Sequence, residues 1–130
     1  VLLVEDEPSV RAVVSRILSE RGFEVIAAID GEHALSVCDD ALLARLSMVV
    51  SDVVMPRLGG PELVTALRAR RSDLPVLFVS GYPESDALDA VLAMPNTGFL
   101  EKPFTPSVLV HAVHEQLDAA APQHQHRTSV

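Results

Sequence analysis

The chain alternates short apolar runs with segments in which apolar residues recur every three or four positions. Most of the short runs are apolar on both sides, which is typical of parallel strands covered on both faces. Strands followed by helical patterns predict right-handed crossovers. We therefore expect an α/β fold with a doubly wound, five-stranded parallel sheet in the order (βα)₅, with strands at 1–4, 24–28, 48–51, 76–79 and 98–100.

The helical segments carry their own start and stop signals. Apolar residues within 10–18 follow the spacing of one helix face, and Gly22 is expected to end that helix. After the N-cap candidate Asp30, one continuous helix is expected to run past Cys38 to Leu42. The remaining helices are expected from Pro61, over 84–94, and from Thr105 as N-cap with Pro106 in the first turn.

Composition excludes several classes of function. Lys and Arg number 10 against 18 Asp and Glu, a formal net charge of -8, so we expect no direct binding of nucleic acid. The apolar runs are shorter than the roughly 20 residues of a membrane-spanning helix, and no signal peptide opens the chain, so no membrane contact is expected. A single cysteine, Cys38, excludes a disulfide within the chain and fits a cytoplasmic location.

The pattern indicates one domain over residues 1–118, with 48% hydrophobic residues in the chain to fill its core. Residues 119–130 are polar and include Pro122, so they are predicted to form a disordered tail or a linker. The chain starts inside an apolar run without an initiating Met, which suggests a piece of a longer protein.

Polar side chains follow four of the predicted strands. Glu5 and Asp6 follow the first strand, Asp52 the third, Ser80 the fourth and Lys102 the fifth. The carboxyl ends of parallel strands meet at one edge of a doubly wound sheet, where ligands bind. We therefore expect these residues to gather at one site.

Three crowded carboxylates repel one another and raise each other's pKa values unless a cation joins them. Mg²⁺ binds one or two carboxylates together with waters and a phosphate oxygen, which suits Asp6 and Asp52 as ligands with Glu5 holding a metal-bound water. An Asp carboxylate can also accept a phosphoryl group, if a metal, a lysine and a hydroxyl stabilise the charge. Lys102 and Ser80 fit the last two roles.

Four segments, in this order, resemble the receiver domains of two-component response regulators and hybrid histidine kinases. They are "LLVEDEP", "SDVVMPRLGG", "VLFVSGY" and "GFLEKPF", and the resemblance covers about residues 1–118. It implies a flavodoxin-like receiver fold and a phosphoryl group taken from a histidine kinase or a histidine phosphotransfer domain. It also implies that the domain catalyses its own phosphorylation and dephosphorylation and then changes the surface it offers to partners.

The resemblance assigns a role to each site residue. Asp52 is implied as the phosphoacceptor, and Lys102 as the residue that contacts the phosphoryl group. Asp6, Asp52 and the backbone carbonyl of Val54 are implied as Mg²⁺ ligands, with Glu5 acting through water.

Ser80 is implied as the switch hydroxyl, and the bond before Pro103 is often cis in such domains. Phe99 stands at a switch position that many members fill with Tyr, and a Glu-Asp pair replaces the commoner Asp-Asp.

Alternatives stay open at the level of function. A phosphorylation-independent interaction module on the same fold would be expected to lack Asp52, Asp6 or Lys102, and all three are present. A haloacid-dehalogenase-like phosphatase needs an acid where Val54 stands, and a nucleotide-binding domain needs a glycine-rich loop where "EDEP" stands. The parent could be a hybrid kinase, a single-domain regulator or a regulator with an output domain.

Overall fold

The computed structural model describes residues 1–81, 89, 91 and 93–120. Its sheet has five parallel strands in the order β2-β1-β3-β4-β5. The strands differ from the predicted ranges by no more than two residues at either end, which confirms the predicted doubly wound sheet. Their bounds are β1 (Leu2–Val4), β2 (Ile26–Ala28), β3 (Val49–Asp52), β4 (Val76–Ser80) and β5 (Thr97–Glu101).

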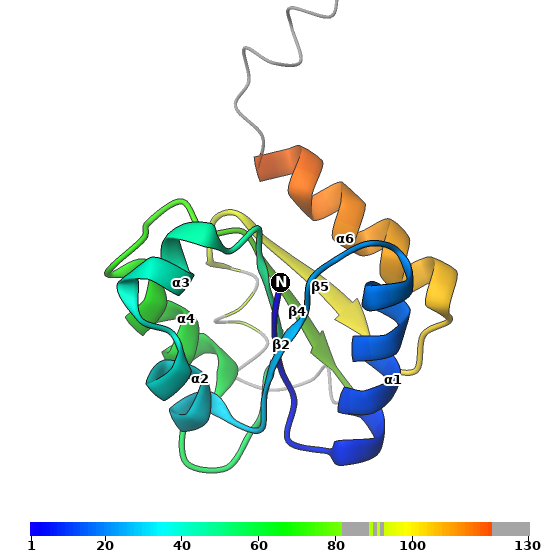
Figure 1. Ribbon diagram of the computed structural model, residues 1–130, viewed down its shortest axis with the longest axis horizontal. Coiled ribbons are helices and arrows are strands. Elements are labelled where there is room, and N and C mark those ends of the chain that lie inside the picture. The colour runs from blue at the N-terminus through cyan, green and yellow to red at the C-terminus, as the bar shows by residue number, and fades with distance from the viewer. Residues whose placement is uncertain (82–88, 90, 92, 121–130) are drawn as a thin grey trace, which may run out of the picture.

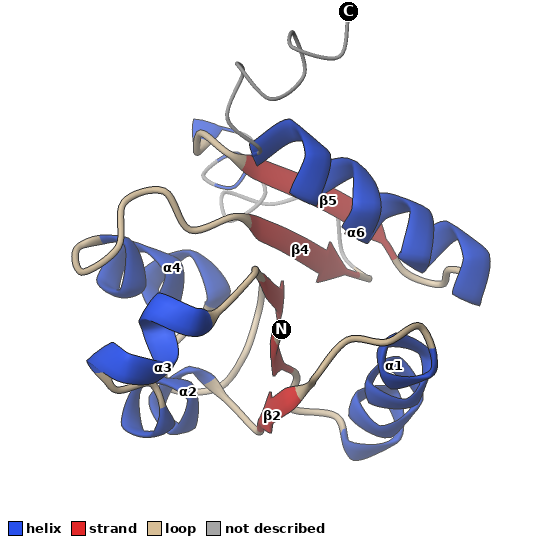
Figure 2. Ribbon diagram, turned by 45° about the horizontal axis from the view of Figure 1, so that its top comes forward, coloured by secondary structure: helices blue, strands red, loops and turns tan. Residues whose placement is uncertain are grey.

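Helices cover both faces of the sheet, as Figures 1 and 2 show. One layer holds α2 (Gly31–Val37), α3 (Asp40–Arg45) and α4 (Gly60–Arg68); the other holds α1 (Pro8–Glu20) and α6 (Pro106–Ala120). Each layer packs its own apolar cluster against the strands, around Leu63 and Phe78 on one side and around Leu18 and Leu109 on the other. Burial on both faces explains why β1 and β4 are almost wholly apolar.

Three of the predicted helix boundaries are confirmed. Helix α1 ends before Gly22, which has a φ of 93°, a left-handed conformation that favours glycine. Helix α4 begins at Gly60, with Pro61 in its first turn. Before α6, the hydroxyl of Thr105 accepts the Val108 N–H at 3.2 Å.

The prediction of one continuous second helix is wrong. Helix α2 ends at Val37, Cys38 leaves the helical conformation, and α3 begins at Asp40. The carboxylate of Asp39 accepts the Leu42 N–H at 2.8 Å and so caps a new helix. The cap satisfies one of the N–H groups that are free at a helix start, which favours two short helices over one long helix here.

Most of the fourth predicted helix, 84–94, lies outside the described residues; Asp89, Val91 and Ala93 within it are helical. Residues 121–130 of the predicted tail also lie outside them. Helix α6 reaches Ala120, and the boundary at 118 stays a prediction. Among the helices of the described part of the chain, none is long and apolar enough to cross a membrane.

Candidate functional site

The polar residues that follow the strands lie around one pocket at the carboxyl edge of the sheet. Asp52 is the last residue of β3, Glu5 and Asp6 follow β1, and Lys102 follows β5. The pocket has a volume of about 510 Å³ and is lined by Glu5, Asp6, Glu7, Asp52, Val54, Gly81, Lys102 and Pro103.

Ser80 ends β4 beside this pocket. The residue is buried, at 2% exposure, and its backbone carbonyl accepts the Lys102 N–H at 2.8 Å. Gly81, the next residue, lines the pocket. Ser80 therefore joins the end of β4 to Lys102 through the backbone.

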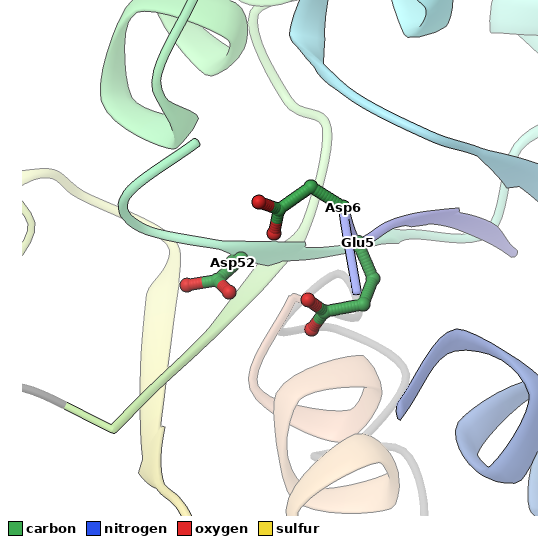
Figure 3. Close-up of side chains that lie close together, drawn as sticks. All are labelled: Glu5, Asp6 and Asp52. Carbon is green, nitrogen blue, oxygen red and sulfur yellow. The ribbon is translucent and has the colours of Figure 1, made fainter. Parts of the chain in front are cut away.

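Three carboxylates form an acidic cluster, made of Glu5, Asp6 and Asp52, in which one oxygen of each lies within 4.8 Å of the others. Figure 3 shows the three side chains around a common space. Asp6 is exposed, whereas Glu5 is 2% and Asp52 9% exposed. Oxygen donors at this spacing suit a hard divalent cation, and a pocket beside them leaves room for water and phosphate ligands.

Lys102 lies between two of these carboxylates. Its Nζ is 3.0 Å from Glu5 Oε1 and 3.1 Å from Asp52 Oδ2. Burial alone would lower the pKa of Lys102, but the hydrogen bonds to Glu5 and Asp52 and the negative charges of these two residues together outweigh burial and raise that pKa above its ordinary value. The ammonium group therefore stays charged at neutral pH and offsets part of the negative charge of the pocket.

Glu5 is held at three points by the chain around it. Besides the contact with Lys102, Oε2 accepts the Glu7 N–H at 3.1 Å, and the backbone carbonyl accepts Arg11 Nη1 at 2.8 Å. Burial raises the pKa of Glu5, the Lys102 hydrogen bond opposes this, and the charge of Asp52 adds to it. Sequence reasoning expected repulsion between carboxylates; burial has the larger effect on Glu5.

The contacts of Glu5 with Lys102 and Arg11 were not predicted from the sequence. The one signal for the Lys102 contact is the choice of Glu at position 5, whose side chain is one methylene longer than that of Asp; the Arg11 contact goes to the backbone carbonyl and has no such signal. Its expected action through a metal-bound water stays a prediction. Each carboxylate oxygen can accept a second hydrogen bond, so the protein contacts leave that role open to Glu5.

Asp52 is held at both oxygens. Oδ2 accepts from Lys102, and Oδ1 accepts the Val54 N–H at a long 3.4 Å. Its side chain is 12% exposed and lines the pocket, so a reactant that enters the pocket can reach it.

The start of α4 packs closely against the backbone of Asp52. A Cβ at Gly60 would collide with the Asp52 carbonyl oxygen and lie 2.7 Å from the Phe78 ring, so only glycine allows α4 to start this close to β3. The Lys102–Pro103 bond is cis, as the resemblance implied. Phe99 of β5 is partly buried and packs against the apolar cluster on the α2–α4 side.

Comparison with known proteins agrees with this geometry. The model of the response regulator receiver domain family matches residues 1–114. The sensor kinase CckA of Brucella abortus is 42% identical over 118 residues, which make up 91% of this chain and 12% of that protein. The transcriptional regulatory protein PrrA of Mycobacterium leprae is 41% identical over 113 residues, 87% of this chain and 47% of that protein.

Solved structures match over nearly their whole length. The receiver domain of the hybrid histidine kinase CckA is 37% identical with a TM-score of 0.76, covering 89% of this chain and 96% of that chain. The chemotaxis protein CheY4 of Vibrio cholerae is 34% identical with a TM-score of 0.76, and the match covers 88% of this chain and 94% of that chain. The chain spans less than half of the two curated relatives named above. Since the family model matches residues 1–114 and the strand-end carboxylates and the lysine lie together, the chain belongs to the response regulator receiver domain family of two-component signalling.

Proposed function

We propose that Asp52 accepts a phosphoryl group from a phosphohistidine of a histidine kinase or a histidine phosphotransfer domain. One observation carries the proposal: Asp52 ends β3 in an open pocket, with Lys102 Nζ 3.1 Å away and two further carboxylates beside it. A carboxylate with a structural role needs neither the open pocket nor the lysine and the two further carboxylates, whereas phosphoryl transfer to a carboxylate uses all of these groups.

The acidic cluster is proposed to bind Mg²⁺. Asp6, Asp52 and the backbone carbonyl of Val54 would be its ligands, and Glu5 would act through water. Three carboxylate oxygens within 4.8 Å of one another support this choice, because oxygen ligands are those that Mg²⁺ prefers. When bound, Mg²⁺ supplies positive charge that neutralises the phosphoryl oxygens beside Asp52.

Asp52, Lys102 and Ser80 each have a separate role in the transfer. A carboxylate oxygen of Asp52 attacks phosphorus; the new O–P bond forms as the P–N bond of the donor breaks, and the imidazole leaves. Lys102 donates a hydrogen bond to a phosphoryl oxygen, which moves its ammonium group from the carboxylate to the phosphoryl group. The Ser80 hydroxyl donates a second hydrogen bond to the phosphoryl oxygens.

The donor protein is proposed to bind in an apolar groove beside the pocket. The groove has a volume of about 320 Å³ and shares Lys102 and Pro103 with the pocket. Val13 in its wall is 49% exposed and leaves an apolar side chain open to a partner on this face of α1. The other lining residues are Ser9, Val10, Val14 and Phe104.

Phosphorylation is proposed to change the surface offered to partners. A phosphoryl group adds a charge of about -1.5 to -2 at neutral pH, and the side chains of Ser80 and Lys102 can move toward that charge. Phe99 lies on β5, two residues before the strand ends ahead of Lys102, and its ring is the proposed second element of the switch. The whole domain is proposed to span residues 1–118, with 119–130 as a tail or linker to a further part of the parent protein.

The test is phosphorylation of the domain by acetyl phosphate with Mg²⁺, followed by intact-mass measurement. Wild type is expected to gain one base-labile phosphate, and Asp52→Asn none, because an amide is not a nucleophile toward phosphorus. Asp40→Asn, at an exposed acid on α3, is the matched control and should gain one phosphate. Equal labelling of wild type and Asp52→Asn would exclude Asp52 as the acceptor.

The alternative is an interaction module on the same fold that acts without phosphorylation. The complete set of Asp52, Asp6 and Lys102 argues against it, because such a module has no use for these residues in contact. A wild-type domain that gains no phosphate in the same experiment would favour it.

A further inference from the structure

The loop between β3 and α4, residues 53–59, is tied to the corner between β2 and α2. Arg57 Nη1 of the loop lies 2.7 Å from Asp30 Oδ2 at that corner. The other oxygen of the same carboxylate, Oδ1, accepts the His33 N–H at 2.8 Å and caps α2. The Asp30 side chain is 7% exposed, so it is a fixed point to which the loop is attached.

The loop needs such an attachment because part of its backbone is in an uncommon conformation. Arg57 has a φ of 69°, in the left-handed region that non-glycine residues rarely adopt unless their surroundings hold them. Next to it, the Leu58 N–H donates to the Pro56 carbonyl at 2.8 Å. A Cβ at Gly31 would lie 2.6 Å from the Leu58 carbonyl oxygen, so corner and loop are in close backbone contact.

The same loop carries groups of the pocket. The carbonyl of its first residue, Val53, accepts the Gly60 N–H at 2.8 Å, which closes the loop at its base. Val54 lines the pocket and donates its N–H to Asp52. Because the loop is short and closed, a shift at Arg57 must be taken up by the few residues between it and Val54.

We propose that Asp30 and Arg57 are positioning residues that set the place of the Val54 carbonyl and thereby the affinity for Mg²⁺. The inference rests on the proposed function, in which that carbonyl is a metal ligand. Arg57 is 63% exposed, so solvent screens the charge of its guanidinium, whereas the Asp30 carboxylate that it contacts is 7% exposed. The effect of the ion pair falls on the geometry of the loop.

The ion pair between Arg70 and Asp40 provides a matched control. Its N–O distance is also 2.7 Å, and one of its partners, Asp40, is likewise exposed, but neither residue belongs to the loop 53–59 that carries Val54 or contacts Asp30. Arg70→Ala therefore reports what the loss of a similar ion pair does without a link to the site.

The experiment measures the Mg²⁺ dissociation constant of the full chain by NMR titration, and amide exchange of residues 53–60 without metal. Arg57→Ala is expected to raise the dissociation constant about three- to tenfold, since residues that orient ligands affect metal affinity while exposed ion pairs have small effects. Asp30→Asn, which keeps an oxygen to cap α2, should raise the dissociation constant by a similar factor. The dissociation constant of Arg57→Lys should stay nearer to that of wild type, and the dissociation constant of Arg70→Ala should equal the wild-type value.

Exchange of the Leu58 and Gly60 amides should be faster in Arg57→Ala and Asp30→Asn, and the double variant should bind Mg²⁺ no more weakly than either single one. The inference is overturned if wild type binds Mg²⁺ and Arg57→Ala binds it equally well, or if the two substitutions are additive. A wild type that binds no Mg²⁺ overturns the proposed metal site as well, so the two failures are distinct.

Discussion

Glu5 and Lys102 make the pocket a site of partly balanced charge. Three carboxylates face one ammonium group, and Lys102 contacts two of them. The remaining negative charge is what makes the pocket attractive to a cation. Asp6 is the exposed member of the cluster, whereas both oxygens of Glu5 already accept hydrogen bonds from the chain.

This difference predicts unequal effects of two alanine substitutions. Asp6→Ala is expected to weaken Mg²⁺ binding by about tenfold or more, and Glu5→Ala by less, because a direct ligand contributes more than a residue acting through water. Calorimetric titration of the two variants against wild type measures both constants. A larger loss in Glu5→Ala would reverse the roles given to the two acids.

The raised pKa of Lys102 also leads us to expect that the stability of the metal-free protein depends on pH. The pKa of Lys102 is raised on folding, so the side chain's contribution to stability is fully present below the ordinary lysine pKa of 10.5 and is lost as pH rises through the folded pKa. Lys102→Met should unfold more easily than wild type by about 1.5–3 kcal/mol at pH 8, the range for hydrogen bonds to charged groups. Urea unfolding of both proteins in EDTA tests this.

The difference in unfolding free energy between the two proteins should stay constant up to about pH 10 and shrink above the ordinary lysine pKa of 10.5. A difference that begins to shrink below about pH 9 would mean that the hydrogen bonds to Glu5 and Asp52 do not hold the charge of Lys102.

At the scale of elements, the order of strands and helices follows from the sequence because burial on both faces leaves a clear apolar pattern. The break between α2 and α3 does not, since Cys38 and Leu42 keep a helical spacing across it. Two consecutive acids, Asp39 and Asp40, supply a cap and a first-turn charge for a new helix. Recognising that pair as a helix start would have located the break.

The site could be predicted as far as topology decides it. Residues at strand ends must meet at one edge of a parallel sheet, so the sequence alone predicts that Asp52 and Lys102 lie together. The contacts of Arg57 with Asp30 and of Arg11 with Glu5 depend on loop conformation. A left-handed Arg57 and a side chain that reaches a backbone carbonyl leave no pattern in the sequence, so these contacts could not be predicted in the same way.

Strands β4 and β5 are the elements expected to report phosphorylation. Phe78 of β4 pairs with Phe99 of β5, and Ser80 with Glu101, so a shift of Ser80 toward Asp52 acts directly on β5. With the phosphoryl mimic beryllofluoride, changes in hydrogen exchange should concentrate in residues 82–104 and be smaller in Ser80→Ala. The coupling expected is modest, about 1–3 kcal/mol.

Ser36→Ala, at an exposed serine on α2, is the control for this measurement. Exchange that stays the same in residues 82–104 when wild type binds beryllofluoride would remove the switch and leave the acceptor chemistry of Asp52 intact.

For the molecule as a whole, chemistry and anchoring lie at opposite edges of the sheet. The pocket is at the carboxyl edge, while Arg68, at the end of α4, joins the other ends of β4 and β5. Its guanidinium donates to the carbonyls of Leu74, Pro95 and Asn96 at 2.7–3.1 Å and to the Thr97 hydroxyl at 3.2 Å. One edge is thus held by a hydrogen-bond network around a single guanidinium, and movement on phosphorylation is expected at the other.

The lysine in the pocket is also the only lysine of the 130-residue chain, since the other nine basic residues counted with it are arginines. Protein made with isotope-labelled lysine therefore carries one labelled side chain, and that side chain contacts Glu5 and Asp52. Its spectrum would follow metal binding, phosphoryl transfer and hydrolysis at the reacting atoms in real time. The receiver carries its own single-site spectroscopic probe without any substitution.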